Sequence, residues 1–175
     1  MVADYILLKA KQEGKPITNK KLQKLLYYTQ AWSAALQNKK LFEDKIEAWI
    51  HGPAVKSVYL EYKKFGAEPI IKTVTPEMVK GIPKDAISVL DQVWSVYSKY
   101  DAPYLEYLTH SEQPWQQARQ GLEPHIVSEN EITFESMRDF YKQKPTKLVG
   151  YKGVPSLTLS RRTNTASALP SFIKD

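Results

Sequence analysis

The stretch that decides the fold is "TNKKLQKLLYYTQAWSAALQ", residues 18–37. Thr18 is a residue type that caps helix N-termini, and Ile17 before it can pack on Leu22. Apolar and small side chains then recur at helical spacing: Leu22, Leu25, Leu26, Thr29, Ser33 and Leu36. The pattern predicts a helix over 19–37 that forms the centre of the core.

Three aromatic residues widen the apolar face of this helix: Tyr27, Tyr28 and Trp32. Large aromatics at helical spacing usually lie in a core, because they bury much apolar area. A face that binds a partner is the alternative for these residues.

The rest of the chain reads as further short helices joined by Gly and Pro signals. Helices are predicted over 2–13, over 53–65 with Pro53 in the first turn, over 84–100, after Asp101, after Gln113 with Pro114 in the first turn, and over 134–143 after Thr133. Alternation at Ile46, Ala48 and Ile50 predicts one short strand, and a second extended piece is expected at Ile70 and Ile71 within the loop 67–83. The predicted fold class is mainly α: a compact helical domain of about six to eight helices with at most one or two short strands, plus a C-terminal extension.

Composition removes several classes of protein. The chain has no cysteine, so disulfides, thiolate zinc sites and cysteine nucleophiles are excluded. It has no run of about 18 apolar residues, and its start lacks the features of a signal peptide. We therefore expect a cytoplasmic protein with no membrane partner.

Basic charge is concentrated at the C-terminal end. Residues 141–175 hold seven Lys and Arg against one Asp, whereas residues 1–140 hold 18 basic and 18 acidic side chains. We predict a helical domain over 1–143 and a basic arm over 144–175 that includes Arg161 and Arg162. The arm either binds a partner, with its charge steering it to an acidic surface, or is a solvated tail.

The stretch "LTHSEQPWQQA", residues 108–118, places His110 and Glu112 two apart. A His-x-Glu pair also occurs in zinc deaminases, which complete the metal shell with Pro-Cys-x-x-Cys. That shell cannot form here, and His51, His110 and His125 lack the spacing of a metal site. We expect no catalytic residue, metal or cofactor, although a hydrolase that uses His110 and Glu112 is an alternative.

Helix signals give these two residues a structural task instead. His110 falls at the end of one helix, where free carbonyls can meet its ring. Glu112 falls at the start of the next helix, where free amides can meet its carboxylate. Both residues would then fix the corner between the two helices.

Three blocks together resemble the Panacea antitoxin domain family, also described as SocA-like or GepA-like phage-associated proteins. They are "PITNKKLQKLLYYTQAWSAAL" (16–36), "LFEDKIEAWIHGPAVKSVYLEYKKFG" (41–66) and "LTHSEQPWQQA" (108–118), and the resemblance covers roughly residues 1–142. The family often has a second proline where this chain has Lys56, a departure that should alter the first turn of a helix and leave the fold unchanged.

The resemblance implies a mostly helical antitoxin that is encoded beside a toxin and neutralises it by direct protein binding. Toxins paired with the family belong to unrelated classes, including small alarmone-synthetase-like enzymes that stop translation. One member instead delivers its toxin to a protease. The family is not known for an active site, so the resemblance implies that the chain is not an enzyme.

We expect the partner to contact aromatic and polar residues of the three blocks together with the arm. The candidates are Tyr28, Trp49, His51, Tyr62, His110, Glu112, Trp115, Arg161 and Arg162. Tyr, Trp and Arg commonly dominate the energetics of interfaces. Two alternatives are a protease adaptor and a repressor that binds operator DNA. For the repressor, Arg161 and Arg162 could enter a groove, but no helix clusters the basic residues of a recognition helix, and "KKLQK" at 20–24 is the nearest case.

Overall fold

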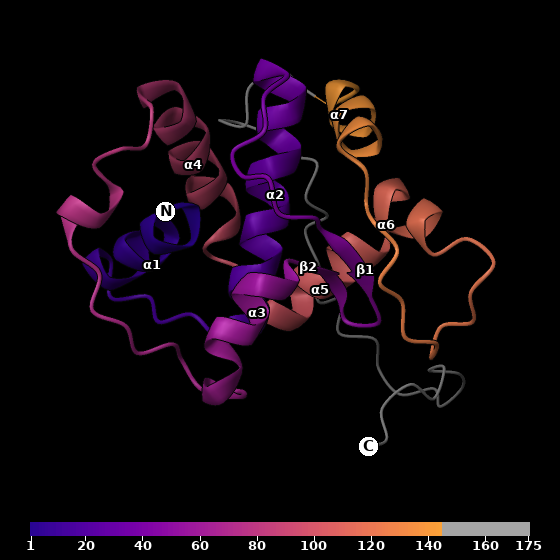
Figure 1. Ribbon diagram of the computed structural model, residues 1–175, viewed down its shortest axis with the longest axis horizontal. Coiled ribbons are helices and arrows are strands. Elements are labelled where there is room, and N and C mark those ends of the chain that lie inside the picture. The colour runs from indigo at the N-terminus through magenta and orange to yellow at the C-terminus, as the bar shows by residue number, and fades with distance from the viewer. Residues whose placement is uncertain (145–175) are drawn as a thin grey trace, which may run out of the picture.

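The computed structural model describes residues 1–144, and its central element is helix α2 (Asn19–Gln37). The helix begins as predicted, because the hydroxyl of Thr18 accepts a hydrogen bond from the backbone N–H of Lys21 at 3.2 Å. Every residue from Leu22 to Ala34 is buried. Other elements therefore enclose this part of α2, which lies in the middle of the fold in Figure 1.

Six further α-helices and one β-hairpin make up the rest of the described chain. Their bounds are α1 (Val2–Gln12), β1 (Glu47–Trp49), β2 (Gly52–Ala54), α3 (Lys56–Tyr62), α4 (Lys84–Tyr97), α5 (Ala102–His110), α6 (Gln113–Ala118) and α7 (Phe134–Lys142), with 3-10 turns η1 (Lys63–Phe65) and η2 (Pro76–Val79). In Figure 1, α1 and α4 lie on one side of α2, and the hairpin, α6 and α7 lie on the other. The predicted fold class is confirmed.

Side-chain caps set two of these helices where the sequence predicted them. The carboxylate of Asp101 accepts a hydrogen bond from the N–H of Tyr104 at 2.8 Å, and the hydroxyl of Thr133 accepts one from the N–H of Ser136 at 3.1 Å.

Within residues 1–144, no helix combines the length and the apolar character that crossing a membrane requires.

The predicted start of a helix at Pro53 is wrong. Gly52 to Ala54 form β2, which pairs antiparallel with β1 so that Pro53 lies opposite Ala48, and the helix begins only at Lys56. The N–H of Ala48 points away from Pro53 and donates to the carbonyl of Asn130 at 2.8 Å. Proline therefore fits this strand because no ladder hydrogen bond is needed at its position.

The loop 67–83 is mostly irregular, as predicted, but it contains η2 and forms no named strand. The extended piece expected at Ile70 and Ile71 is reduced to an isolated bridge between Thr18 and Pro69 and a hydrogen bond from the N–H of Ile70 to the carbonyl of Ile17 at 2.9 Å. This short pairing ties the loop to the residues just before α2.

Buried polar side chains of α2 hold the segments that follow it. The amide of Gln30 donates to the carbonyl of Phe42 at 3.0 Å and accepts from the N–H of Leu41 at 2.8 Å. Gln23 accepts from the N–H of Val55 at 2.8 Å. Since buried backbone groups need partners, these amides fix the course of the chain into and out of the hairpin.

Candidate functional site

Five of the predicted partner-binding residues lie at one corner of the molecule: Trp49, His51, His110, Glu112 and Trp115. The hairpin supplies the first two, the end of α5 supplies the third, and α6 supplies the others as its N-cap and an early residue. The indole N–H of Trp115 donates to the carbonyl of Trp49 at 3.0 Å. This bond fastens α6 to the hairpin.

His110 forms part of the wall of this corner. Its ring stacks on the ring of Trp115 with centroids 4.0 Å apart, and its Nε2 is buried without a hydrogen-bond partner within the described residues. Burial lowers the pKa of His110 to about 4, so the ring is neutral near pH 7. The predicted contact of the ring with free carbonyls is absent from the described residues, and the amide of Gln116 instead donates to the His110 carbonyl at 2.9 Å.

His51 and Trp49 form the accessible edge of the corner. The side chain of His51 is 76% exposed, and its Nδ1 lies 3.2 Å from Oε1 of Glu106. Glu106 also pairs with Lys20 of α2. Burial alone would raise the pKa of Glu106, but the Lys20 ammonium and the His51 ring outweigh it and the pKa is lowered. The surface here therefore carries an indole edge, an imidazole and a carboxylate that stays ionised.

Lys24 lies buried directly beneath the hairpin turn. Its Nζ donates to the carbonyl of Pro53 at 3.1 Å, and burial lowers its pKa to about 7, with Glu106 opposing that shift. Sequence reasoning missed this residue, since a lysine near a helix start is usually solvated. Its position between Gln23 and Leu25, at the start of the apolar run, is the signal that could have identified it.

The lysines of "KKLQK" are all engaged within the chain. Lys20 pairs with Glu106, Lys21 donates to the carbonyl of Ser98 at 2.6 Å, and Lys24 is buried. α2 is also enclosed by other elements, so it is not free to enter a DNA groove. This arrangement does not support "KKLQK" as a DNA-recognition element. Arg161 and Arg162, the other residues considered for DNA binding, lie outside the described residues.

Gly52 permits the close approach of the turn to Lys24. Its φ is +89°, and an added Cβ would lie 2.8 Å from both Nζ of Lys24 and Oγ1 of Thr109. We expect Gly52→Ala to lower the free energy of unfolding by about 2 kcal/mol, since it adds steric overlap to backbone strain. Urea denaturation measures this.

Gly121 provides a matched control for that substitution. Its φ is +83°, and nothing lies within 4 Å of an added Cβ. Gly121→Ala should therefore lower the free energy of unfolding only through backbone strain, by about 1 kcal/mol. Equal losses for the two variants would show that the contact with Lys24 and Thr109 is unimportant.

Glu112 faces the interior side of the corner. Although the residue as a whole is half-buried, its carboxylate accepts hydrogen bonds from the hydroxyls of Tyr27 at 3.0 Å, Tyr28 at 3.4 Å and Tyr141 at 2.7 Å. These contacts join α6 to α2 and α7. The predicted contact with free amides of α6 is wrong, because Glu112 is the N-cap residue but makes no side-chain cap bond.

The environment of Glu112 has opposing effects on its ionisation. Burial raises the pKa of Glu112 to about 7, while the hydrogen bonds from the three phenols lower it. Three hydroxyls that donate to one carboxylate satisfy polar groups that would otherwise be unpaired in the core. The cluster is therefore a buried structural junction that titrates near neutral pH.

Arg119, just after α6, joins the corner to the next loop and was missed by sequence reasoning. Its guanidinium donates to the carbonyls of Ala48 at 2.9 Å and Ile126 at 2.7 Å, and more weakly to those of Glu123 at 3.2 Å and Pro124 at 3.3 Å. It also lies over the ring of Trp115 at 5.3 Å. No spacing in the sequence indicates that this arginine binds carbonyls far along the chain.

The remaining candidates lie elsewhere. Tyr28 and Tyr62 are buried, with 0% and 3% of their surface exposed, so the prediction that they contact a partner is corrected: both belong to the core. Tyr62 lies in α3, where its hydroxyl accepts a hydrogen bond from Lys72 at 2.8 Å. Arg161 and Arg162, and the predicted arm as a whole, lie outside the described residues.

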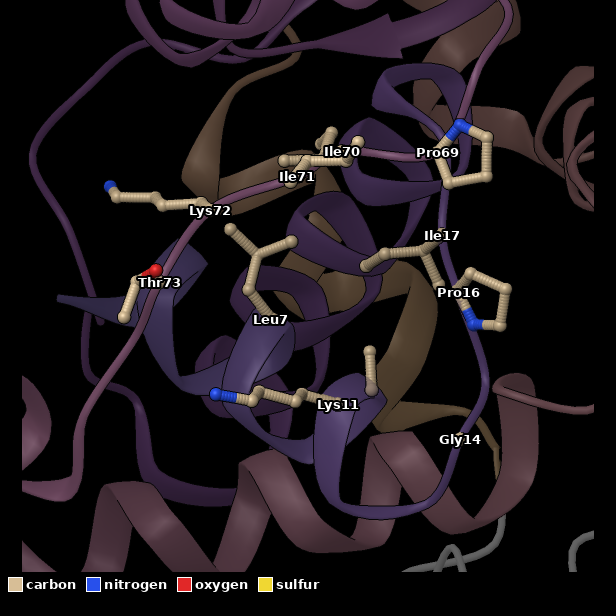
Figure 2. A pocket seen from close by; sticks show the side chains of 11 residues that line it. Leu7, Lys11, Gly14, Pro16, Ile17, Pro69, Ile70, Ile71, Lys72 and Thr73 are labelled. Carbon is tan, nitrogen blue, oxygen red and sulfur yellow. The ribbon is translucent and has the colours of Figure 1, made fainter.

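A hollow of about 460 Å³ lies away from this corner, between the end of α1 and the extended residues 69–73. Figure 2 shows Leu7 of α1 pointing toward Ile70 and Ile71 across it, with Lys11 further along α1. Its lining is mainly aliphatic, with Lys11, Lys72 and Thr73 as the side chains that carry a polar group. None of the five converging residues lines it.

A family model described as "Antitoxin SocA-like, Panacea domain" matches residues 22–116, more than half of the chain. The chain belongs to this family. No curated protein and no solved structure matches it. The matched segment of this Panacea protein runs from α2 into α6 and includes the whole corner, but it excludes Tyr141, Arg119 and the loop that Arg119 holds.

Proposed function

We propose that this chain is an antitoxin that neutralises a co-encoded protein toxin by direct binding. The observation that carries the proposal is the match to the SocA-like Panacea antitoxin family over 22–116. The accessible edge of the corner supports it, because His51 is exposed and Trp49 and Trp115 are half-buried within the matched segment. The proposal assigns binding, and no reaction, to the chain, and a translation-inhibiting toxin of the alarmone-synthetase type is the partner class that we test first.

A growth experiment tests this function. The neighbouring toxin gene is induced with and without the full chain, and the chain is then purified from cells that express both genes together. We expect growth to be restored and the toxin to co-purify. Growth that is restored without a stable complex would favour delivery to a protease, and rescue through reduced toxin transcription would favour repression of the operon.

The accessible edge of the corner is tested by His51→Ala. We expect the amount of antitoxin required for neutralisation to rise by about tenfold, because a small number of residues usually carry most of the binding energy of an interface. The free energy of unfolding should change by less than about 0.5 kcal/mol, since the side chain is exposed.

Met78→Ala is the control for that change. Met78 is also exposed, at 41%, but it lies in η2 near the opposite end of the molecule (Figure 1). Full neutralisation by His51→Ala, or an equal loss in Met78→Ala, would remove His51 from the interface.

A further inference from the structure

The loop between α6 and α7 displays apolar side chains to solvent. Val127 is 77% exposed, Ile126 41% and Leu122 36%. They are three of the eight large hydrophobic side chains that are exposed within residues 1–144. These three lie within six residues of one loop, and apolar side chains that gather on an exposed surface favour contact with another protein.

Side-chain hydrogen bonds from Arg119 and Asn130 hold the same loop in one conformation. Arg119 binds the carbonyls of Glu123, Pro124 and Ile126, and its other nitrogen binds Ala48 of β1. The side-chain amide of Asn130 donates to the carbonyl of Ala118 at 2.9 Å, which closes the far end of the loop. A loop that is already ordered loses less conformational entropy when it binds, so it is suited to docking.

The charge of the loop indicates what kind of surface it fits. Residues 120–131 contain three glutamates and no lysine or arginine. Glu129 pairs with Lys56 at 2.6 Å and Glu131 with Lys45 at 3.7 Å, while Glu123 makes no ion pair among the described residues. The apolar side chains are thus bordered by acidic groups, one of them free to pair with a cation of a partner.

We propose that residues 120–131 are a toxin-docking loop, which binds an apolar patch of the toxin bordered by lysine or arginine. This inference rests on the function proposed above and extends the binding site beyond the segment that the family model matches. The loop is continuous with the corner, because Arg119 lies over Trp115 and binds the residue that precedes Trp49. Val127, Ile126 and Leu122 supply the contact area, and Glu123 supplies attraction and orientation.

Val127→Asp tests the proposal in the full chain, with the co-encoded toxin purified as the probe. We expect the dissociation constant measured by calorimetry to rise by about tenfold or more, since a charge replaces an apolar contact. The matched control is Ile71→Asp, which alters an 83% exposed side chain on the segment at the opposite end of the molecule (Figure 1). It should bind within about twofold of the unaltered chain.

Glu123→Lys tests the charge of the proposed partner surface. We expect weaker binding by about threefold or more at low salt, with the difference shrinking as salt is raised. Tighter binding of the toxin by Glu123→Lys would contradict the proposal that lysine or arginine borders the apolar patch of the toxin. Both loop residues are at the surface, so thermal denaturation should show that the variants remain folded.

The outcomes distinguish the loop from the proposed function. If the unaltered chain binds the toxin and Val127→Asp binds equally well, the docking loop is overturned and the antitoxin function stands. Equal losses of toxin affinity in Val127→Asp and Ile71→Asp would also overturn the docking loop. If the unaltered chain neither binds nor neutralises the toxin, both proposals fail together.

Discussion

Arg119→Ala is expected to lower the free energy of unfolding by about 3 kcal/mol. The guanidinium is buried and donates four hydrogen bonds to main-chain carbonyls, and the carbonyl of Ala48 would lose its donor in a region without access to water. Contact with the ring of Trp115 would also be lost. Urea denaturation followed by tryptophan fluorescence measures the loss.

Arg138→Ala is the control for this prediction. Arg138 pairs with Asp139 on the surface of α7, where an exposed ion pair contributes little. Arg138→Ala should lower the free energy of unfolding by less than about 0.5 kcal/mol. Arg119→Lys should lie near Arg119→Ala, because one ammonium cannot span carbonyls on both β1 and the loop. A loss from Arg119→Ala no larger than that from Arg138→Ala would contradict the role assigned to Arg119.

Relative to Glu112→Gln, the unaltered chain should lose stability as pH rises from 4.5 to 8. The pKa of Glu112 is about 7 in the folded state against an ordinary value of 4.5, so folding favours the protonated carboxyl. Its contribution is fully present below pH 4.5 and is lost as pH rises through 7. The linkage amounts to about 3 kcal/mol.

The comparison with Glu112→Gln isolates the effect that titration of the Glu112 carboxyl has on stability. Glutamine keeps an oxygen that can accept from the tyrosines but does not titrate. Lys24 and His110, whose pKa values are also perturbed by burial, are present in both proteins and cancel in the difference. Urea denaturation of both proteins across this pH range gives the difference. Parallel stability curves would show that Glu112 does not titrate near neutral pH in the folded protein.

The fold was predictable where local signals agree with the tertiary structure. The spacing of Leu22, Leu25 and Leu26 and the caps at Thr18, Asp101 and Thr133 located helices to within a few residues. These signals are local, because a helix satisfies its own backbone and a cap acts within three residues. The hairpin was harder to predict, since Pro53 is as typical of a helix start as of a strand position that needs no N–H.

The sequence indicated residues to consider for the candidate site, but not their roles. Residues of the second and third blocks do meet at one corner, but their roles depend on partners far along the chain. Glu112 binds tyrosines of α2 and α7. Arg119 binds β1 across 71 residues of sequence. The periodicity of the sequence does not indicate such long-range contacts. It also does not indicate that other residues cover Tyr28 and keep it from contacting a partner.

The division between interior and surface assigns different tasks to residues that lie close together around the corner. His110 and Glu112 belong to packed or hydrogen-bonded clusters, so their substitution should act mainly through stability. His51, Trp49 and the loop 120–131 reach the surface, so their substitution should act mainly through binding. Scoring each variant for both unfolding and neutralisation separates the two groups.

Hydrogen–deuterium exchange of the full chain, alone and in complex with its co-encoded toxin, tests the central claim most directly. We predict slower exchange in the complex for backbone amides of residues 46–55 and 108–131, with little change over 66–83. Protection confined to α1 and residues 66–83, or no difference between the free chain and the complex, would contradict the claim that the antitoxin binds through this corner.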